Sequence, residues 1–310
     1  MAIGGIDIGG TKIAVGIVDG EHLVAKQVMP TAAELGLAYA VERIEDSIER
    51  LIQLTGLDLE GIGIGCTGPV DPLTGTLETN AFLPGWEGSV LTTALSEKFH
   101  LSVAMENDAD AAALAEGRFG SGKGSPCFLY VTVSTGIGGG LLIDGHLFRG
   151  AGRAHPEIGH HVIDPSGPAC FCGAHGCWES LASGPAMARW YQLHRSERLA
   201  SVDDPPVDAS QICERARGGE ELATRAVART GRFLGLGIAN LITLFTPNRI
   251  ALGGGVIGSW DLFEPVIGET IRQNCGLVPF ERTAVAPAVL GTDIGLLGAA
   301  QACIHRYCMA

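Results

Sequence analysis

Apolar residues recur along the chain with two spacings, and these predict alternating helices and strands. Between residues 37 and 52 they fall on one face at helical spacing, and Gly56 then ends the segment. Residues 61–65, 102–105 and 249–257 are short apolar runs that lead into turns, as buried strands do. Further helices are expected over residues 109–119, 225–245 and 294–305. Strands that alternate with helices predict α/β layers.

One segment near the start of the chain recurs later. Ile-Asp-Ile-Gly-Gly-Thr at residues 6–11 corresponds to Val-Thr-Val-Ser-Thr-Gly at 131–136, and residues 17–20 correspond to 142–145, with a constant offset of 125 residues. Each copy predicts a β-hairpin that ends in an Asp-Gly turn of type I′. The small residues at the first turn of each copy would let backbone N–H groups approach a polyphosphate from two sides. Two ordinary hairpins are the alternative.

Length and charge limit the classes of protein. A chain of 310 residues exceeds the usual size of one core, which predicts two domains. The net charge of −13 argues against a nucleic-acid partner. No apolar run reaches the roughly 18–20 residues of a membrane span, and no basic stretch precedes an apolar one at the start. We expect a cytoplasmic protein without a membrane or nucleic-acid partner.

Three of the nine cysteines form a cluster, Cys170-x-Cys172-x4-Cys177, and His160 lies ten residues before it. In a reducing cytosol this pattern favours a metal site, and four such ligands suit tetrahedral Zn²⁺. His161 and His175 are rival ligands, whereas His155 is expected to be a loop residue. A site with four protein ligands shapes a loop and cannot activate water. The six scattered cysteines are expected to be small buried side chains.

Several motifs occur together in a fixed order, and the resemblance that they carry extends from residue 7 to about residue 298. They are Asp7-Ile-Gly-Gly-Thr-Lys12, Glu106-Asn-Asp108-Ala, Ser134-Thr-Gly-Ile-Gly-Gly-Gly140, Glu157-Ile-Gly-His160, Cys170-Phe-Cys-Gly-Ala-His-Gly-Cys177-Trp-Glu179 and Leu252-Gly-Gly-Gly255. In this order the chain resembles the ROK family, which contains sugar kinases and sugar-responsive repressors. The resemblance implies an α/β actin-like ATPase (ribonuclease H-like) fold of two domains with a central cleft. Residues 1–108 plus 293–310 would form the small domain, and residues 109–292 the large domain with the zinc loop.

The motifs suggest how a nucleotide would bind. The Asp7 carboxylate can hold Mg²⁺ directly or through water, while Gly9, Gly10 and Thr11 offer donors to phosphate oxygens. Lys12 would add a point charge or remain a solvated lysine. On the opposing turn, Thr135, Gly136 and Gly138 would contact phosphate, and Gly254 would lie against the adenosine or serve packing alone. ATP with Mg²⁺ is the expected cofactor.

A sugar hydroxyl is a weak nucleophile, so transfer of a phosphoryl group to it needs a carboxylate that accepts its proton. Asp108 is the candidate base, and a helix N-cap is its alternative role. The resemblance implies this base role and makes Asn107 a sugar ligand. It also makes Glu157, His160 and Glu179 sugar ligands, with Gly68 and Asn80 completing the pocket. The expected zinc fixes one imidazole nitrogen and leaves the other for a sugar hydroxyl.

The motifs do not all indicate the same sugar. Gly85-Trp86 resembles the glucokinase branch, whereas His155-Pro156 and residues 181–185 resemble fructokinase-like members. We expect a glucokinase of carbohydrate metabolism and glycolysis that phosphorylates the 6-hydroxyl of glucose. N-acetylmannosamine, N-acetylglucosamine and fructose follow as alternatives, and a homodimer is the expected assembly.

Two other classes of protein remain as rivals. A ROK repressor would need a winged helix before the first hairpin, where six residues precede Asp7, so we expect no such function. An actin-like ATPase without a sugar substrate would share the two turns but would not need Asp108, the cysteine cluster or Glu157.

Overall fold

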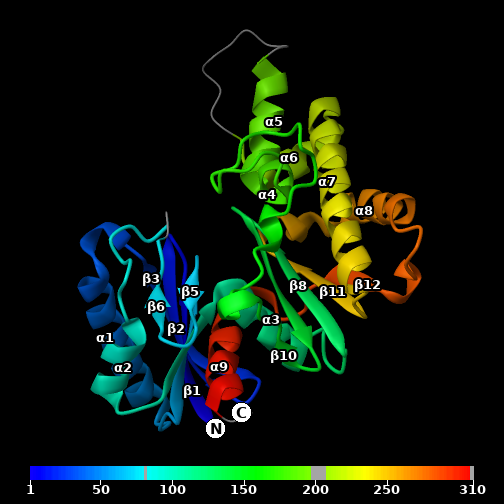
Figure 1. The fold of residues 1–310 in the computed structure, drawn as a ribbon. Helices are drawn as coiled ribbons and strands as arrows, with labels where there is room; N and C mark the ends of the chain where they lie inside the picture. Colours follow the sequence, from blue (N-terminus) through cyan, green and yellow to red (C-terminus); the bar gives the residue numbers. More distant parts are fainter. Residues whose placement is uncertain (80–81, 197–206, 308–310) are drawn as a thin grey trace. The chain divides into compact units, whose positions relative to one another are not determined.

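The structure is a computed structural model that describes residues 1–79, 82–196 and 207–307 (Figure 1). The chain groups into two compact units. The first comprises Met1–Gly124, Gly140–Pro156 and Val289–Ala310, and the second comprises Ser125–Gly139 and Glu157–Ala288. These units are compact groups of residues and are not defined as domains of a fold. The domain limits expected from the sequence therefore stay a prediction.

A five-stranded sheet forms the centre of the first unit, with the order β3-β2-β1-β4-β7. Strand β1 pairs antiparallel with β2 and parallel with β4, and β4 pairs parallel with β7. The carboxyl ends of β1, β4 and β7 therefore lie at one edge of the sheet. The strands are β1 (Ala2–Ile8), β2 (Lys12–Asp19), β3 (His22–Pro30), β4 (Gly61–Cys66) and β7 (Val103–Asn107). A two-stranded sheet of β5 (Val70–Asp71) and β6 (Thr76–Leu77) is separate from it.

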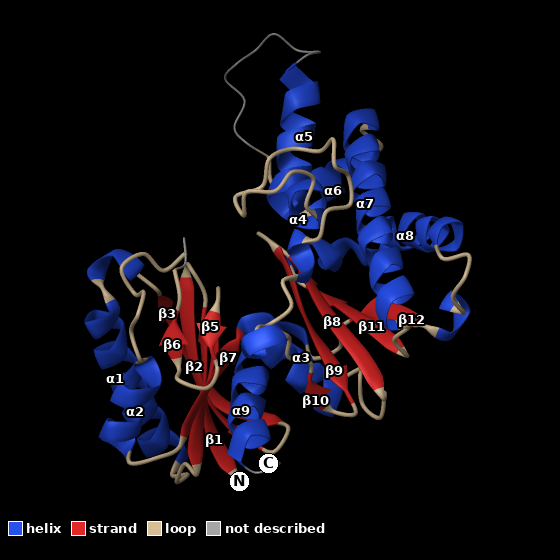
Figure 2. Cartoon of the chain, in the orientation of Figure 1, coloured by secondary structure: helices blue, strands red, loops and turns tan. Residues whose placement is uncertain are grey.

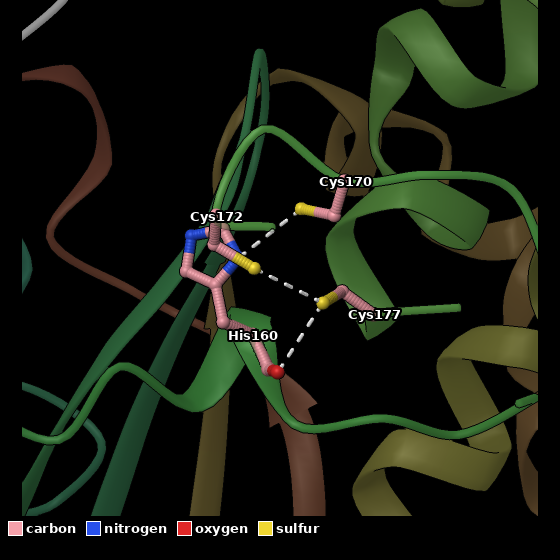
Figure 3. Close-up of side chains that lie close together, drawn as sticks. All are labelled: His160, Cys170, Cys172 and Cys177. Carbon is pink, nitrogen blue, oxygen red and sulfur yellow. Dashed lines mark hydrogen bonds between the residues drawn. The ribbon is translucent and has the colours of Figure 1, made fainter. Parts of the chain in front are cut away.

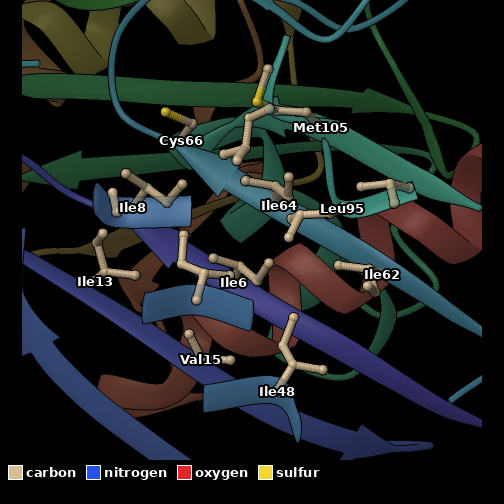
Figure 4. Packing of buried hydrophobic residues seen from close by; sticks show 14 of the residues in the cluster. Ile6, Ile8, Ile13, Val15, Ile48, Ile62, Ile64, Cys66, Leu95 and Met105 are labelled. Carbon is tan, nitrogen blue, oxygen red and sulfur yellow. The ribbon is translucent and has the colours of Figure 1, made fainter. Parts of the chain in front are cut away.

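Helices cover both faces of this sheet. On one face α1 (Leu37–Thr55) and α2 (Leu91–Phe99) pack against apolar side chains of β1, β2, β4 and β7 (Figures 1 and 4). On the other face α3 (Asp108–Arg118) and α9 (Ile294–Tyr307) pack together against β1, β4 and β7. The alternation of side chains along a strand divides the core in this way: Ile6 and Ile8 belong to the first cluster, and Ile3 to the second. The last helix therefore packs on the sheet of the first unit.

The second five-stranded sheet has the order β10-β9-β8-β11-β12, with β11 parallel to both β8 and β12. The two sheets have the same strand order around their central strands: β2 and β3 lie on one side of β1 as β9 and β10 lie on one side of β8, and β4 and β7 correspond to β11 and β12. Both bounds of β8 lie 125 residues after those of β1, so the sequence repeat corresponds to repeated hairpins. The strands are β8 (Cys127–Val133), β9 (Ile137–Ile143), β10 (His146–Leu147), β11 (Arg249–Gly253) and β12 (Ala284–Pro287).

The two hairpins differ in the turn that closes them. In the second, Ile143 pairs with His146, and the central residues Asp144 and Gly145 have φ of 50° and 81°, as type I′ requires. In the first, Asp19 pairs with His22, so the central residues are Gly20 and Glu21. Positive φ is found at Gly20 (62°) but not at Glu21, which is typical of type II′. The predicted type I′ turn is therefore wrong for the first copy, because its Asp-Gly pair is displaced by one residue.

Helices of the second unit gather around α7, which contacts α4, α5, α6 and α8 (Figure 2). They are α4 (Trp178–Ala182), α5 (Gly184–Ser196), α6 (Ala209–Arg217), α7 (Glu221–Phe245) and α8 (Trp260–Asn274). The predicted helix over 225–245 is confirmed and begins at Glu221, and Thr246 ends it in a left-handed conformation with φ 42°. Short 3₁₀ turns complete the secondary structure: Ala33–Leu35, Ala151–Arg153, Ile158–His160, Gly255–Ser259, Phe280–Arg282 and Gly291–Asp293.

Among the described residues, no helix combines the length and the apolar character needed to cross a membrane.

Candidate active site

Three polar segments follow the parallel strands of the first unit at one sheet edge. Asp7 pairs with Gly65 near the end of β1, and Cys66 at the end of β4 pairs with Asn107 at the end of β7. Asp108 follows at once as the first residue of α3. The predicted phosphate turn, the segment that leads to Gly68 and the predicted base therefore share the place where open α/β sheets bind ligands.

The Asp7 carboxyl is enclosed by the first turn of α9. A Cβ built on Gly295 would lie 2.4 Å from Asp7 Oδ2, so a larger residue there would displace the carboxylate. Burial raises the pKa of Asp7, and the exposed Lys12 ammonium partly opposes this shift. A cation bound at this carboxylate would favour its ionised form.

The turn after Asp7 is held by the next segment of the chain. Gly9 N donates to Lys12 O at 2.9 Å, and Thr31 donates through its Oγ1 to Gly9 O at 2.6 Å and through its N to Thr11 O at 3.0 Å. Thr31 has no exposed surface. Thr31 therefore ties the turn to the end of β3.

Helix α3 is capped by Asn107. Asn107 Oδ1 accepts from Ala109 N at 2.9 Å and from Asp110 N at 3.4 Å, and its Nδ2 donates to Gly68 O at 3.2 Å. Since the cap is Asn107, the alternative role of Asp108 as N-cap is wrong. Asp108 Oδ1 accepts from Ala109 N at 2.8 Å. Two of the predicted sugar-site residues, Gly68 and Asn107, are in direct contact.

Electrostatics suit Asp108 to proton transfer. Burial, followed by the charge of Asp7, raises the pKa of Asp108 to about 7. The Ala109 N–H and His155 oppose this shift, and the charge of Asp110 adds the smallest contribution to it. A carboxylate with a pKa near 7 is a stronger base than an ordinary aspartate and is still largely ionised at slightly alkaline pH.

Four ionisable residues beside this site form a largely buried network that the sequence analysis did not assign. The Arg149 guanidinium bonds to both Glu106 and Asp110, and His155 Nδ1 lies 3.0 Å from Asp110 Oδ2. Asp110 has no exposed surface. Burial raises the pKa of Glu106 to about 7 despite Arg149, and the two carboxylates raise the pKa of Arg149 against burial. His155 lies in a loop, as expected, but it has an electrostatic role.

A signal for this network was present in the sequence. Asp110 stands in the alanine-rich segment 109–115, and an acidic residue on an apolar helix needs a buried cation nearby. The sequence alone could not identify Arg149, which is 39 residues away, as that cation.

In the second unit the β8–β9 turn carries the second predicted phosphate segment. Ser134 N donates to Gly136 O at 2.8 Å, and Ser134 O accepts from Gly184 N at 2.9 Å. Ile137 N donates to Glu179 Oε2 at 2.8 Å. A predicted sugar ligand, Glu179, is thus bonded to the predicted phosphate turn.

Gly254 follows β11 and touches the end of β8. Its φ is 89°, and a Cβ there would lie 2.3 Å from Val133 O. Packing alone therefore requires glycine at this position, and any nucleotide contact would be additional. Strands β8 and β11 are parallel, and Gly253 pairs with Thr132. The predicted nucleotide residues that follow the two strands therefore lie at one edge of the sheet.

The cysteine cluster and His160 lie together (Figure 3). Cys170 Sγ is 3.4 Å from His160 Nδ1, Cys172 Sγ is 3.5 Å from Cys177 Sγ, and the four ligand atoms lie within 4.8 Å of one another. Tetrahedral bonds of about 2.3 Å to sulfur separate the donor atoms by about 3.8 Å, so this group could hold a metal ion.

Neither rival histidine belongs to this group of four. His161 Nδ1 lies 2.5 Å from Ile158 O, and the backbone of His175 forms a β-bridge with Ala169. His160 faces the sulfur atoms through Nδ1, which leaves Nε2 for another partner. Phe171 packs edge-on against the His160 ring, with centroids 4.9 Å apart.

Glu157 and His160 belong to one short turn, in which His160 N donates to Glu157 O at 3.0 Å. Glu157 is exposed and His160 is half-buried. Asn80, the remaining predicted sugar ligand, lies outside the described residues.

Known proteins of one family are similar to this chain over nearly its whole length. The model of the ROK family matches residues 3–306. A glucokinase from Streptomyces coelicolor is 34% identical over 96% of this chain and 95% of that protein. A kanosamine kinase from Amycolatopsis mediterranei is 33% identical over 95% of this chain and 93% of that protein.

Two solved structures of ROK kinases also resemble this chain in fold. A ROK hexokinase from Thermus thermophilus has a TM-score of 0.84 at 36% identity, with 100% of both chains covered. A ROK glucokinase from Streptomyces griseus, in complex with glucose and AMPPNP, has a TM-score of 0.81 at 33% identity over 97% of this chain and 98% of that one. The predicted α/β class and actin-like ATPase fold are confirmed.

Proposed function

Because the chain belongs to the ROK family, we propose that it is an ATP-dependent sugar kinase, with the 6-hydroxyl of glucose as the first candidate acceptor. In this reaction the hydroxyl oxygen attacks the γ-phosphorus, the bond from that phosphorus to the β,γ-bridging oxygen breaks, and ADP leaves. The hydroxyl proton passes to the Asp108 carboxylate. The products are a sugar phosphate and ADP.

The observation that carries this proposal is the environment of Asp108. The carboxylate follows a parallel strand at the sheet edge that also holds Asp7, and Asn107 performs the capping in its place. Its pKa, raised to about 7, suits a general base near neutral pH. An ATPase without a sugar substrate would not need a second carboxylate of this kind beside the phosphate turn.

The nucleotide would use both repeated turns. Gly9, Gly10 and Thr11 would offer donors to phosphate oxygens, with Lys12 as a nearby charge and Asp7 as the ligand of Mg²⁺. Thr135, Gly136 and Gly138 would contact phosphate from the β8–β9 turn, and Gly254 would lie against the adenosine. Mg²⁺ would neutralise charge that develops on the phosphates.

The sugar ligands would come from several segments. Asn107 has an amide N–H besides the one bonded to Gly68, while Glu157 and Glu179 accept bonds from sugar hydroxyls. Zn²⁺ held by His160, Cys170, Cys172 and Cys177 would fix the His160 ring through Nδ1, so that Nε2 can meet a hydroxyl. The metal would act on loop shape and would not take part in phosphoryl transfer.

The choice of sugar is the finer part of the proposal. Trp86, from the motif that resembles glucokinases, is 1% exposed and donates from Nε1 to Ala33 O at 3.3 Å, so it packs in the first unit. His155, from the motif that resembles fructokinases, contacts the buried Asp110. These residues can influence the sugar through the loops they hold. N-acetylmannosamine, N-acetylglucosamine and fructose therefore follow glucose as candidates, and the kanosamine kinase relative adds kanosamine.

A panel of these sugars at equal concentration, with Mg²⁺ and ATP, tests the proposal. We expect the highest kcat/KM with glucose and a product phosphorylated on the 6-hydroxyl. Higher kcat/KM with an amino sugar or fructose would move the assignment to that branch. We also propose a cytoplasmic homodimer, for which light scattering should give twice the mass of the 32.2 kDa chain.

A further inference from the structure

Glu179 connects two parts of the second unit that the proposed function treats separately. It is the second residue of α4, whose N-cap is the cluster residue Cys177. Its Oε2 accepts from Ile137 N, in the turn that would bind phosphate. A Cβ built on Gly136 would lie 2.4 Å from the same oxygen. The carboxylate therefore lies directly against this turn.

Hydrogen bonds and burial hold the segment that presents Glu179. The Trp178 indole is buried, and its Nε1 donates to Phe233 O on α7 at 2.9 Å. The Trp178 backbone N donates to His161 O at 3.0 Å. Five residues after Glu179, Gly184 N donates to Ser134 O at 2.9 Å. The segment is thus fixed to α7, to the loop after His160, and at two points to the β8–β9 turn.

We propose that Glu179 is a positioning residue for the phosphate-binding turn, in addition to its role as a sugar ligand. The proposal rests on the proposed function, since it assigns the β8–β9 turn to phosphate. The carboxylate accepts a charge-assisted hydrogen bond from Ile137 N and so fixes the direction of the neighbouring N–H groups. The Ile137 N–H is occupied, and the phosphate donors are therefore Thr135, Gly136 and Gly138.

Glu179 would link the sugar site to the phosphate-binding turn. A sugar hydroxyl that donates to Glu179 bonds to the same carboxylate that holds the turn, so sugar and nucleotide share one anchoring residue. Loss of the side chain should weaken nucleotide binding even when no sugar is present. A residue that served as a sugar ligand alone would have no such effect.

Two substitutions separate the hydrogen bond from the charge. Glu179→Gln keeps an oxygen that accepts from Ile137 N and removes the charge, whereas Glu179→Ala removes both. The first measurement is amide hydrogen exchange over residues 134–139 in the ligand-free full chain. We expect exchange close to the native rate in Glu179→Gln and clearly faster in Glu179→Ala, because the N–H of Ile137 loses its acceptor.

The second measurement is the Kd of Mg²⁺-ADP without sugar. Removal of a negative charge alone should not weaken an anionic ligand, so Glu179→Gln should bind at least as tightly as the native chain. Glu179→Ala should bind about tenfold more weakly than Glu179→Gln, the order of effect expected when the hydrogen bond that holds the Ile137 N–H is lost. Equal Kd values for the two variants, or equal exchange over 134–139, would overturn the positioning role. A native chain that binds no nucleotide would instead refute the proposed function. The exchange result would then still show whether Glu179 holds the turn at residues 134–139.

Discussion

Asn107 caps helix α3 with its side-chain oxygen, and the neighbouring Asp108 therefore enters the helix as its first residue with a carboxylate that is not the cap. The division of roles matters because a capping carboxylate would be held by backbone N–H groups and its pKa would fall. The pKa of Asp108 instead rises to about 7, mainly through burial. The amide takes the structural role, and the acid is available for the proposed proton transfer.

Replacement of Asp108 should remove turnover and spare binding. For Asp108→Asn we expect kcat to fall about 10²–10⁴-fold, the usual contribution of a positioned general base. The Kd for glucose, measured by calorimetry, should change by a few-fold at most because the amide has nearly the same shape.

A matched control for this variant is Asp58→Asn, an exposed aspartate in the loop before β4. Its kcat should equal that of the native enzyme. If Asp108→Asn retains more than a tenth of native kcat, Asp108 is not the base.

The raised pKa of Asp108 predicts a distinct pH dependence. Only the ionised carboxylate accepts a proton, so kcat/KM should rise with pH through about 7 and fall about tenfold per unit well below it. An aspartate of ordinary pKa would place this limb near pH 4. Initial rates between pH 5 and 9, with an assay whose coupling enzyme is in excess, check the prediction; a flat profile down to pH 5 argues against it.

The four-residue cluster should hold one zinc ion per chain. Cys172→Ser replaces a thiolate with a poor zinc ligand, so we expect metal content by mass spectrometry to fall and the KM for sugar to rise through His160. The chemical step should change less than sugar binding, because a site of four protein ligands has no open position.

Cys213→Ser is the control for general cysteine effects, since Cys213 is a buried thiol of α6 that does not belong to the cluster of four. Its zinc content should remain native. Native protein that carries no zinc after expression in zinc-supplemented medium would refute the metal assignment.

Arg149 should be important for stability as well as for the site. Arg149→Met leaves Glu106 and the fully buried Asp110 without their guanidinium partner, and breaking a buried ion pair in this way costs about 3–5 kcal/mol. Urea unfolding at pH 8 measures the change. Lys98→Ala breaks an exposed pair with Glu49 and should cost less than about 1 kcal/mol. Similar losses for both variants would contradict the buried network.

Much of the fold could be predicted from the sequence because local patterns determine it. The helical spacing of apolar residues in α1 and the repeat of β1 and β2 at β8 and β9 are properties of short segments. The cluster of four metal ligands was also found, because three cysteines and a histidine within eighteen residues must fold close together.

Contacts between distant segments could not be predicted in the same way. The bonds of Arg149 to Glu106 and Asp110 span about forty residues, and the bond of Glu179 to Ile137 spans a similar distance. The type II′ turn at Gly20 depends on the register of β2 against β3, which the Asp-Gly motif did not determine. In each case tertiary packing chose the partner.

The most direct test of the central claim is ADP release by the purified chain with Mg²⁺-ATP, measured with and without glucose. The account predicts that release is at least a hundredfold faster with glucose, and that each ADP is matched by one sugar phosphate. ADP release at the same rate without any sugar, or no phosphorylated product from any hexose offered, would contradict it.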